Sequence, residues 1–241
     1  MKANKILLGV AIALVIYLGV SSFGLFSNIK GSGNVIKETR NLEVFHAIEA
    51  GGAFNITLKQ GEPQQVIVET DDNIMPIIIT KVKAGELEIS QEKSSINATK
   101  LEVTITVSNI DDIDISGACT IKSLGLIKSN QLEIECSGAA EAEMELECKK
   151  LNLDFSGASK GAFEGKTKDL EIDASGASKV DCENVNAERV NVDASGASKV
   201  LLSANKIIDI EASGASKVVY QTEGASIKTE TSGAANIKRK K

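Results

Sequence analysis

The stretch Leu170-Glu171-Ile172-Asp173-Ala174-Ser175-Gly176-Ala177 alternates aliphatic and acidic residues and ends in Ser-Gly-Ala. This tripeptide occurs seven times in the second half of the 241-residue chain, with its serines at Ser116, Ser137, Ser156, Ser175, Ser195, Ser213 and Ser232. Successive serines are 21, 19, 19, 20, 18 and 19 residues apart. A nearly fixed period of this length indicates one short structural unit that stacks on copies of itself.

The residues before each serine have the pattern of a strand. Three residues before the serine the side chain is mostly aliphatic, and two residues before it the side chain is always acidic. Alternation with period two predicts a β-strand with one buried face. A coil of about 19 residues is too short for a helix and two strands, so the sequence predicts an all-β fold. We expect a parallel β-solenoid with about 19 residues per coil in the C-terminal half, and coils about 4.8 Å apart.

Two sets of residues are predicted to be structurally essential. Glycine accepts a positive φ and lets neighbouring coils approach closely, which suits the corner after each serine. In three repeats alanine precedes the serine and valine follows five residues after it, as at Ala174 and Val180. At Phe155 and Gly161 the sizes are exchanged, which predicts that these two positions meet in a packed core. The corner glycines are Gly117, Gly138, Gly157, Gly176, Gly196, Gly214 and Gly233.

The chain divides into three parts. Residues 1–28 are interpreted as a signal peptide or an N-terminal membrane anchor, because Met1–Lys5 is basic and Ile6–Phe26 contains no charge. Residues 29–110 are predicted to form an irregular N-terminal β region, and residues 111–241 the regular Ser-Gly-Ala solenoid. The strands expected in the irregular region are 42–49, 54–59, 66–70, 77–82, 87–91 and 101–107. That region either continues the coil period in degenerate form or packs as distinct β-structure on the first regular coil.

Composition limits the possible functions. The net charge is −6 and aromatic residues make up only 3% of the chain, with no tryptophan. An acidic chain of this kind lacks the basic footprint of a nucleic-acid-binding protein. The four cysteines do not share a column of the repeat, so we expect free, buried thiols. They are Cys119, Cys136, Cys148 and Cys182.

No residues are predicted to be catalytic. His46 is the only histidine, which excludes a histidine zinc site, and no nucleophile can be assigned to it. Acidic residues stacked about 5 Å apart repel one another, and solvent plus a lysine column across the corner is the expected compensation. Calcium bound between successive carboxylates is the alternative, with Asp114, Glu135 and Asp154 as the candidate ligands. No other cofactor is expected. The lysines of the column are Lys160, Lys179, Lys199 and Lys217.

The sequence also resembles a known bacterial family. The segments Ile29–Val35, Phe45–Glu49, Phe54–Gly61 and Asp71–Pro76, together with the Ser-Gly-Ala repeats, are similar to the family called putative auto-transporter adhesin, head GIN domain. The resemblance covers roughly Ile29 to Lys241 and implies an exported all-β envelope protein of Gram-negative bacteria with an adhesion role. It supplies no catalytic or binding residues. The literal string Gly-Ile-Asn is absent from this chain.

The sequence therefore favours a non-enzymatic exported cell-envelope protein that serves as an adhesion or binding scaffold. Two alternatives stay open, a membrane-anchored envelope sensor or assembly partner and a carbohydrate-active β-helix enzyme. The expected partners are a glycan, a matrix component or an envelope protein, with no nucleic acid. The membrane is a further partner if residues 1–28 are retained, and an oligomer is compatible with the pattern. The expected location is the periplasm, the cell envelope or the extracellular space.

Overall fold

The computed structural model describes residues 28–240 except 93–94. The signal peptide or anchor predicted for residues 1–28 therefore lies outside the described residues, apart from Asn28. Within the described part of the chain, no helix has the length and apolar character that crossing a bilayer requires.

The described residues lie mostly in strands, and the single helix among them is the short 3-10 helix η1 (Met75–Ile77). The first strands are β1 (Ile29–Lys30), β2 (Val35–Arg40), β3 (Ala47–Gly52), β4 (Asn55–Gln60), β5 (Gln65–Asp71), β6 (Ile78–Lys83), β7 (Glu86–Gln91), β8 (Ile96–Asn97) and β9 (Leu101–Val107). The solenoid then contains β10 (Asp112–Gly117), β11 (Thr120–Ser123), β12 (Ile127–Lys128), β13 (Gln131–Cys136), β14 (Glu141–Phe155), β15 (Lys160–Ala174), β16 (Lys179–Ala194), β17 (Lys199–Ala212), β18 (Lys217–Gln221), β19 (Ser226–Thr231) and β20 (Asn236–Arg239).

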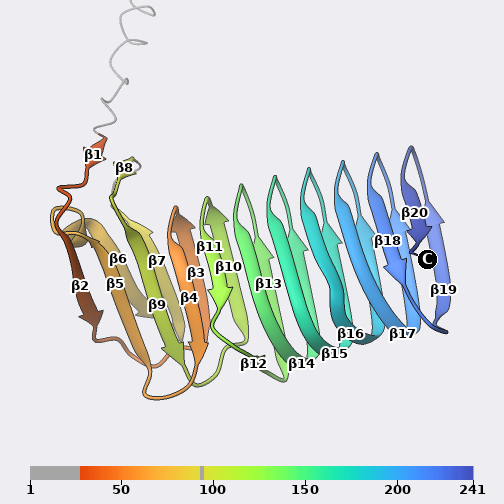
Figure 1. The fold of residues 1–241 in the computed structure, drawn as a ribbon, viewed down its shortest axis with the longest axis horizontal. Helices are drawn as coiled ribbons and strands as arrows, with labels where there is room; N and C mark the ends of the chain where they lie inside the picture. Colours follow the sequence, from red (N-terminus) through yellow and green to blue (C-terminus); the bar gives the residue numbers. More distant parts are fainter. Residues whose placement is uncertain (1–27, 93–94, 241) are drawn as a thin grey trace, which may run out of the picture.

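Successive coils stack in parallel, which confirms the predicted all-β solenoid (Figure 1). The register matches equivalent repeat positions, so that Asp154 pairs with Asp173 and Asp173 pairs with Asp193. Each of β14 to β17 carries nearly a whole coil, because the strand bends midway instead of ending. In β14 the strict alternation of buried and exposed residues breaks at Lys149 and Lys150, where the chain turns. We call this bend the second corner.

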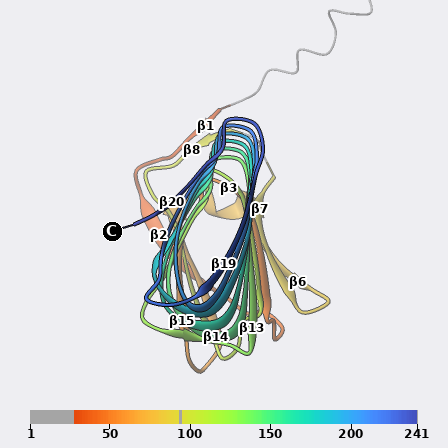
Figure 2. The same cartoon turned by 90° about the vertical axis from the view of Figure 1, so that its right-hand side faces the viewer.

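The coils enclose the core between two walls that meet at the narrow Ser-Gly-Ala corner and diverge towards the second corner (Figure 2). The acidic wall contains β7, β3, β10, β13, the second halves of β14 to β17, and β19. The lysine wall contains β9, β4, β11, the first halves of β14 to β17, β18 and β20. Aliphatic side chains from both walls fill the interior.

The seven corner glycines lie in one file along the solenoid. Their φ angles are between 66° and 74°, a region that disfavours side chains. A Cβ atom on Gly176 would lie 2.6 Å from the carbonyl oxygen of Gly157. The other six glycines give 2.5–2.9 Å to the glycine carbonyl oxygen of the adjacent coil, which for Gly117 belongs to Gly52. That same oxygen accepts a hydrogen bond from the next coil, as in the 2.7 Å bond from the Ala177 N–H to Gly157. Each corner therefore requires glycine for its own conformation and for the coil beside it.

Three glycine-to-alanine variants separate these two requirements. An alanine at Gly176 would have a positive φ and would also clash with the adjacent coil. Gly125 has a φ of 86° but open space around its Cβ position, and Gly224 has open space without a positive φ. In urea unfolding we expect Gly125→Ala to cost about 1–2 kcal/mol, Gly176→Ala clearly more, and Gly224→Ala less than about 0.5 kcal/mol. Equal losses for Gly125→Ala and Gly176→Ala would show that the stacking contact contributes nothing.

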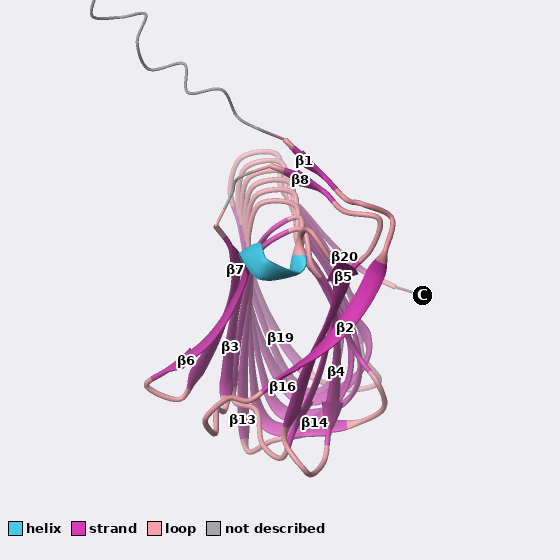
Figure 3. Ribbon diagram, turned by 90° about the vertical axis from the view of Figure 1, so that its left-hand side faces the viewer, coloured by secondary structure: helices cyan, strands magenta, loops and turns pink. Residues whose placement is uncertain are grey.

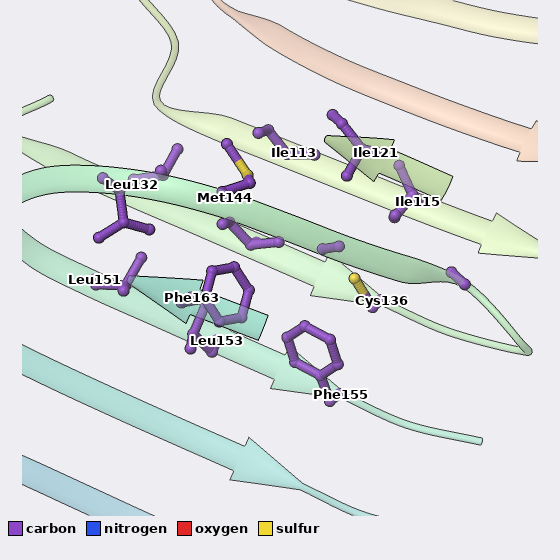
Figure 4. Packing of buried hydrophobic residues seen from close by; sticks show 14 of the residues in the cluster. Ile113, Ile115, Ile121, Leu132, Cys136, Met144, Leu151, Leu153, Phe155 and Phe163 are labelled. Carbon is purple, nitrogen blue, oxygen red and sulfur yellow. The ribbon is translucent and has the colours of Figure 1, made fainter. Parts of the chain in front are cut away.

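Phe155 fills the core at the one repeat in which glycine occupies the facing position. It is fully buried and makes an edge-to-face contact with Phe163, with ring centroids 6.0 Å apart at 79° (Figure 4). A Cβ atom on Gly161 would lie 2.6 Å from Phe155 Cζ and equally close to Phe163 Cε2. The exchange of sizes seen in the sequence therefore corresponds to direct contact across the interior.

A double-mutant cycle tests this compensation. Phe155→Ala is expected to cost about 3–5 kcal/mol because it opens a cavity, and Gly161→Val alone should also destabilise because it clashes. The combined variant recreates the Ala174 and Val180 arrangement of the neighbouring coil. It should be more stable than Phe155→Ala, with a coupling of about 0.5–3 kcal/mol. Chemical denaturation of all four proteins measures the coupling, and strictly additive losses would contradict contact between the two sites.

Irregular steps in the sequence correspond to irregular stacking. The 20-residue step is absorbed between β15 and β16, where the register shifts between Ala162 and Glu164. The 18-residue step shortens β17, whose pairing with β16 jumps between Cys182 and Ala187. Both shifts lie in the lysine wall on the approach to the second corner. The Ser-Gly-Ala corner keeps its register throughout.

The N-terminal region both continues the stack and closes its end. β3 and β4 pair in parallel with β10 and β11, whereas β5 pairs antiparallel with β2 and β9, and β6 pairs antiparallel with β7. Chain order is not spatial order here, since Ile115 stacks on Ala50 and Ala50 on Ile89. The segment containing η1 lies across the mouth of the solenoid with Ile74 and Met75 buried (Figure 3). The strand expected over 42–49 begins only at Ala47.

A buried carboxylate fastens this closing segment to the chain that precedes β2. Asp71 accepts hydrogen bonds from the backbone N–H groups of Gly33 (2.8 Å) and Thr99 (2.7 Å). Burial raises the pKa of Asp71, but these N–H donors outweigh it, so that its pKa lies below the ordinary value. Its neighbour Asp72 accepts from the Ser32 hydroxyl and the Asn34 amide. The aspartates of this segment therefore have a structural role.

Candidate functional site

One outward position of the acidic wall is occupied by a carboxylate on every coil. The register places them in a single file, so the candidate ladder Asp114, Glu135 and Asp154 lies on three adjacent strands. The file extends in both directions beyond these three, because β3 and β7 carry matching glutamates. In spatial order it is Glu88, Glu49, Asp114, Glu135, Asp154, Asp173, Asp193, Glu211 and Glu230.

Only the two ends of this file are neutralised. Lys81 pairs with Glu88 at 2.9 Å, and Lys228 pairs with Glu230 at 3.1 Å. Across the residues that the structure describes, the seven carboxylates between them make no ion pair. Partial burial and then the neighbouring carboxylates raise the pKa of Glu49, Asp114, Glu135 and Asp173 above their ordinary values. The file is thus a continuous stretch of uncompensated negative charge.

The lysine column does not compensate this charge as the sequence analysis expected. Lys160, Lys179, Lys199 and Lys217 form their own file, but on the opposite wall of the solenoid. Lys160 pairs with Glu141 of its own wall at 2.5 Å. Within the described part of the chain, no ion pair joins the two files. Reversing direction at the Ser-Gly-Ala corner points the two sets of side chains away from each other, so the molecule has two charged faces.

Asp173 and Asp169 lie on the same strand, and replacing either by a neutral residue should change the free energy of unfolding in opposite directions. Asp169 accepts both Arg189 Nε (2.5 Å) and Arg189 Nη2 (2.9 Å), which lowers its pKa, whereas the pKa of Asp173 is raised. At about pH 7 we expect Asp173→Asn to raise the free energy of unfolding and Asp169→Asn to lower it.

The pH dependence distinguishes this explanation from simple packing changes. The gain from Asp173→Asn should vanish as the pH falls through the raised pKa of Asp173 towards about 4, because the wild-type group then becomes neutral as well. The loss from Asp169→Asn should persist to lower pH, since its carboxylate protonates only below its ordinary value. Urea unfolding across this range measures both. A destabilised Asp173→Asn at neutral pH would contradict the repulsion.

Several clefts lie near the second corner, among them a larger and a smaller one with many charged side chains in their linings. The larger, about 630 Å³, is lined by Lys128, Glu147, Lys166, Asn186 and Glu188 among others. Glu147 pairs there with Lys166 at 2.9 Å and with Lys128 at 3.8 Å, and Glu188 pairs with Lys206, so both carboxylates of this cleft have ion-pair partners. The smaller cleft, about 370 Å³, is acidic, with Met144 and Phe163 contributing to its lining; its carboxylates are Glu143, Glu145, Glu164, Asp181 and Glu183.

These clefts were missed by the sequence reasoning, although a signal for the larger one exists. When positions are counted forward from each serine, the residues that line the larger cleft fall at different positions of the repeat, because the insertions lie before the second corner. Counting nine residues back from the next serine aligns Lys128, Glu147, Lys166 and Asn186 in one column. The structure pairs these residues in the same order.

The residues with catalytic potential do not assemble into a reactive group. His46 Nδ1 lies 2.9 Å from Asp111 Oδ1, and both side chains are about half exposed. No hydrogen bond to a serine, threonine or cysteine extends this pair among the residues described. The four cysteines are free and buried, as predicted, and burial raises the pKa of each thiol. Thiols of this kind are poor nucleophiles.

Aromatic platforms and clustered metal ligands are also absent from the described surface. Phe45, Phe54, Phe155 and Phe163 are all buried in the core, and Tyr220 packs against its edge. Sugar rings usually stack on exposed aromatic faces, which this part of the chain does not offer. No three histidine, cysteine or acidic side chains in residues 28–240 (93–94 aside) come together to hold a metal ion. Calcium binding along the carboxylate file stays a prediction.

Residues 44–224 match the family described as putative auto-transporter adhesin, head GIN domain. The chain belongs to this family. The resemblance noted in the sequence is therefore confirmed over most of the N-terminal region and most of the solenoid. Among curated proteins, none matches the sequence.

Solved structures of bacterial proteins share the fold. A putative adhesin from Bacteroides fragilis is 23% identical, with a TM-score of 0.81 over 88% of this chain and 100% of its own. A putative adhesin from Parabacteroides merdae is 18% identical, with a TM-score of 0.76 over 89% of this chain and 99% of its own. A putative lipid binding protein from Parabacteroides distasonis is 16% identical, with a TM-score of 0.75 over 89% and 100%. At these identities the likeness establishes the fold alone.

Proposed function

We propose that this protein is a non-enzymatic, exported binding module of the bacterial cell envelope that contacts its partner through the acidic wall. The observation that carries the proposal is the run of seven carboxylates without ion-pair partners, one per coil, between Glu49 and Glu211. Membership of an adhesin family supports both export and a binding role. The lack of a reactive group around His46 supports a role without catalysis.

The acidic wall favours a protein partner with a basic surface over a neutral glycan. Repulsion along the file is relieved when positive charge from a partner approaches, so binding and stabilisation act in the same direction. The wall repeats at the spacing of parallel strands, about 4.8 Å. Such a surface suits a broad contact over several coils. A neutral sugar would find no exposed aromatic platform on the described surface.

Screening the purified protein against arrays of matrix and envelope proteins and of glycans tests this function. The key variant is the triple Asp154→Asn, Asp173→Asn and Asp193→Asn, which removes the centre of the file without removing an ion pair. We expect it to bind basic proteins at least tenfold more weakly than wild type, which corresponds to about 1.4 kcal/mol. Binding should also weaken as the salt concentration rises.

The matched control carries Lys179→Gln, Lys199→Gln and Lys217→Gln, three equally spaced changes on the opposite wall. It should bind as tightly as wild type. Binding that is lost in the lysine variant and retained in the aspartate variant would move the contact to the other face. Turnover of any arrayed glycan would contradict the non-enzymatic role altogether.

A further inference from the structure

The two ends of the solenoid are finished differently. At the N-terminal end, Ile74, Met75 and Ile78 lie buried over the mouth, and β6, which pairs antiparallel with the first strand of the acidic wall, carries Lys81 and Lys83. At the C-terminal end the final coil lies open (Figure 2). There Ile227 is 39% exposed, whereas Ile208, its equivalent one coil earlier, is completely buried. The last coil therefore presents core-type residues to solvent.

The backbone of this open end also offers two strands for pairing. Among the described residues, β19 pairs only with β17, and β20 pairs only with β18. Their outer edges are rows of free N–H and C=O groups, which another strand can satisfy. Arg239 Nη2 donates to the Thr222 carbonyl at 2.7 Å beside the mouth. The inward positions Ile227, Thr229, Thr231 and Ile237 all remain at least partly exposed.

We infer that this end is an interface with a second copy of the chain, joined end to end about a twofold axis. β19 and β20 run in opposite directions on the two walls. We place the twofold axis perpendicular to the solenoid axis, along the line from the Ser-Gly-Ala corner to the second corner. This axis places β19 of one copy beside β20 of the other in antiparallel orientation, so both unpaired strand edges gain a partner. The same axis places the Ser-Gly-Ala corners of the two copies next to each other, so that the hydrophobic core of one copy meets the core of the other.

Charge selects this arrangement over the alternative twofold. With the axis along the cross-section, the acidic wall of each copy meets the lysine wall of its partner. Glu230 and Glu211 then approach the partner strand that carries Lys238, with Lys217 one coil behind it. The perpendicular axis would instead bring acidic wall against acidic wall. The capped N-terminal end prevents head-to-tail growth, so the assembly stops at two copies.

Light scattering after size exclusion, combined with small-angle X-ray scattering, tests this dimer on the purified protein. We expect twice the monomer mass and a particle about twice as long at unchanged width. Ile227→Lys should raise the dimer Kd at least tenfold, whereas Val44→Lys, at a site that is already 79% exposed, should leave it unchanged. Circular dichroism of both variants checks that the fold is retained.

A charge exchange provides a second test that does not depend on the core residue. Lys238→Glu should weaken the dimer because it faces Glu230 of the other copy, and adding Glu230→Lys should restore it. A monomer at every concentration, or a mass that grows without limit, would overturn the inference. So would a dimer whose Kd neither Ile227→Lys nor Lys238→Glu changes.

Discussion

The stacked Ser-Gly-Ala corner is the constraint on which the structure depends. Each corner glycine has a positive φ and leaves room for the glycine carbonyl of the preceding coil, which in turn accepts the N–H of the following alanine at 2.7 Å. A side chain at this position would strain its own turn and displace the adjacent coil at once. Because the contact recurs at every coil, it holds the register of both walls while the rest of the coil varies in length.

Strict register has an electrostatic consequence. When coils stack residue on residue, any residue type that recurs in the sequence becomes a file in space, and a repeated acid becomes a row of repelling charges. Ion pairs between equivalent positions arise where neighbouring coils differ, as at Arg189 with Asp169 or Lys166 with Glu147. The raised pKa of Asp173 and the lowered pKa of Asp169, four residues apart, are both results of this rule.

The regular half of the fold was predictable because local pattern and tertiary contact share one period. Alternation around Ile172 and Asp173 defines the strand, the spacing of the serines defines the stack, and the exchange at Phe155 and Gly161 identifies two facing positions. The N-terminal region was less predictable because its partners are distant in sequence: Ala50 lies between Ile89 and Ile115. The opposite facing of the two charged columns was also missed, since spacing along the chain does not reveal the direction of a side chain after a corner.

Translational symmetry suits a scaffold of this kind to binding better than to catalysis. Catalysis needs one side chain in surroundings unlike those of its neighbours, whereas each acid of the file has nearly the same surroundings as the next. Singular surroundings occur where the period fails, and here the register shifts at Ala162 and Cys182 lie beside the acidic cleft near the second corner. Elsewhere, equivalent groups recur at constant spacing, so the surface offers the same contact at each coil. A partner bound as proposed would contact many coils at once, so the loss of any single residue would change its affinity little.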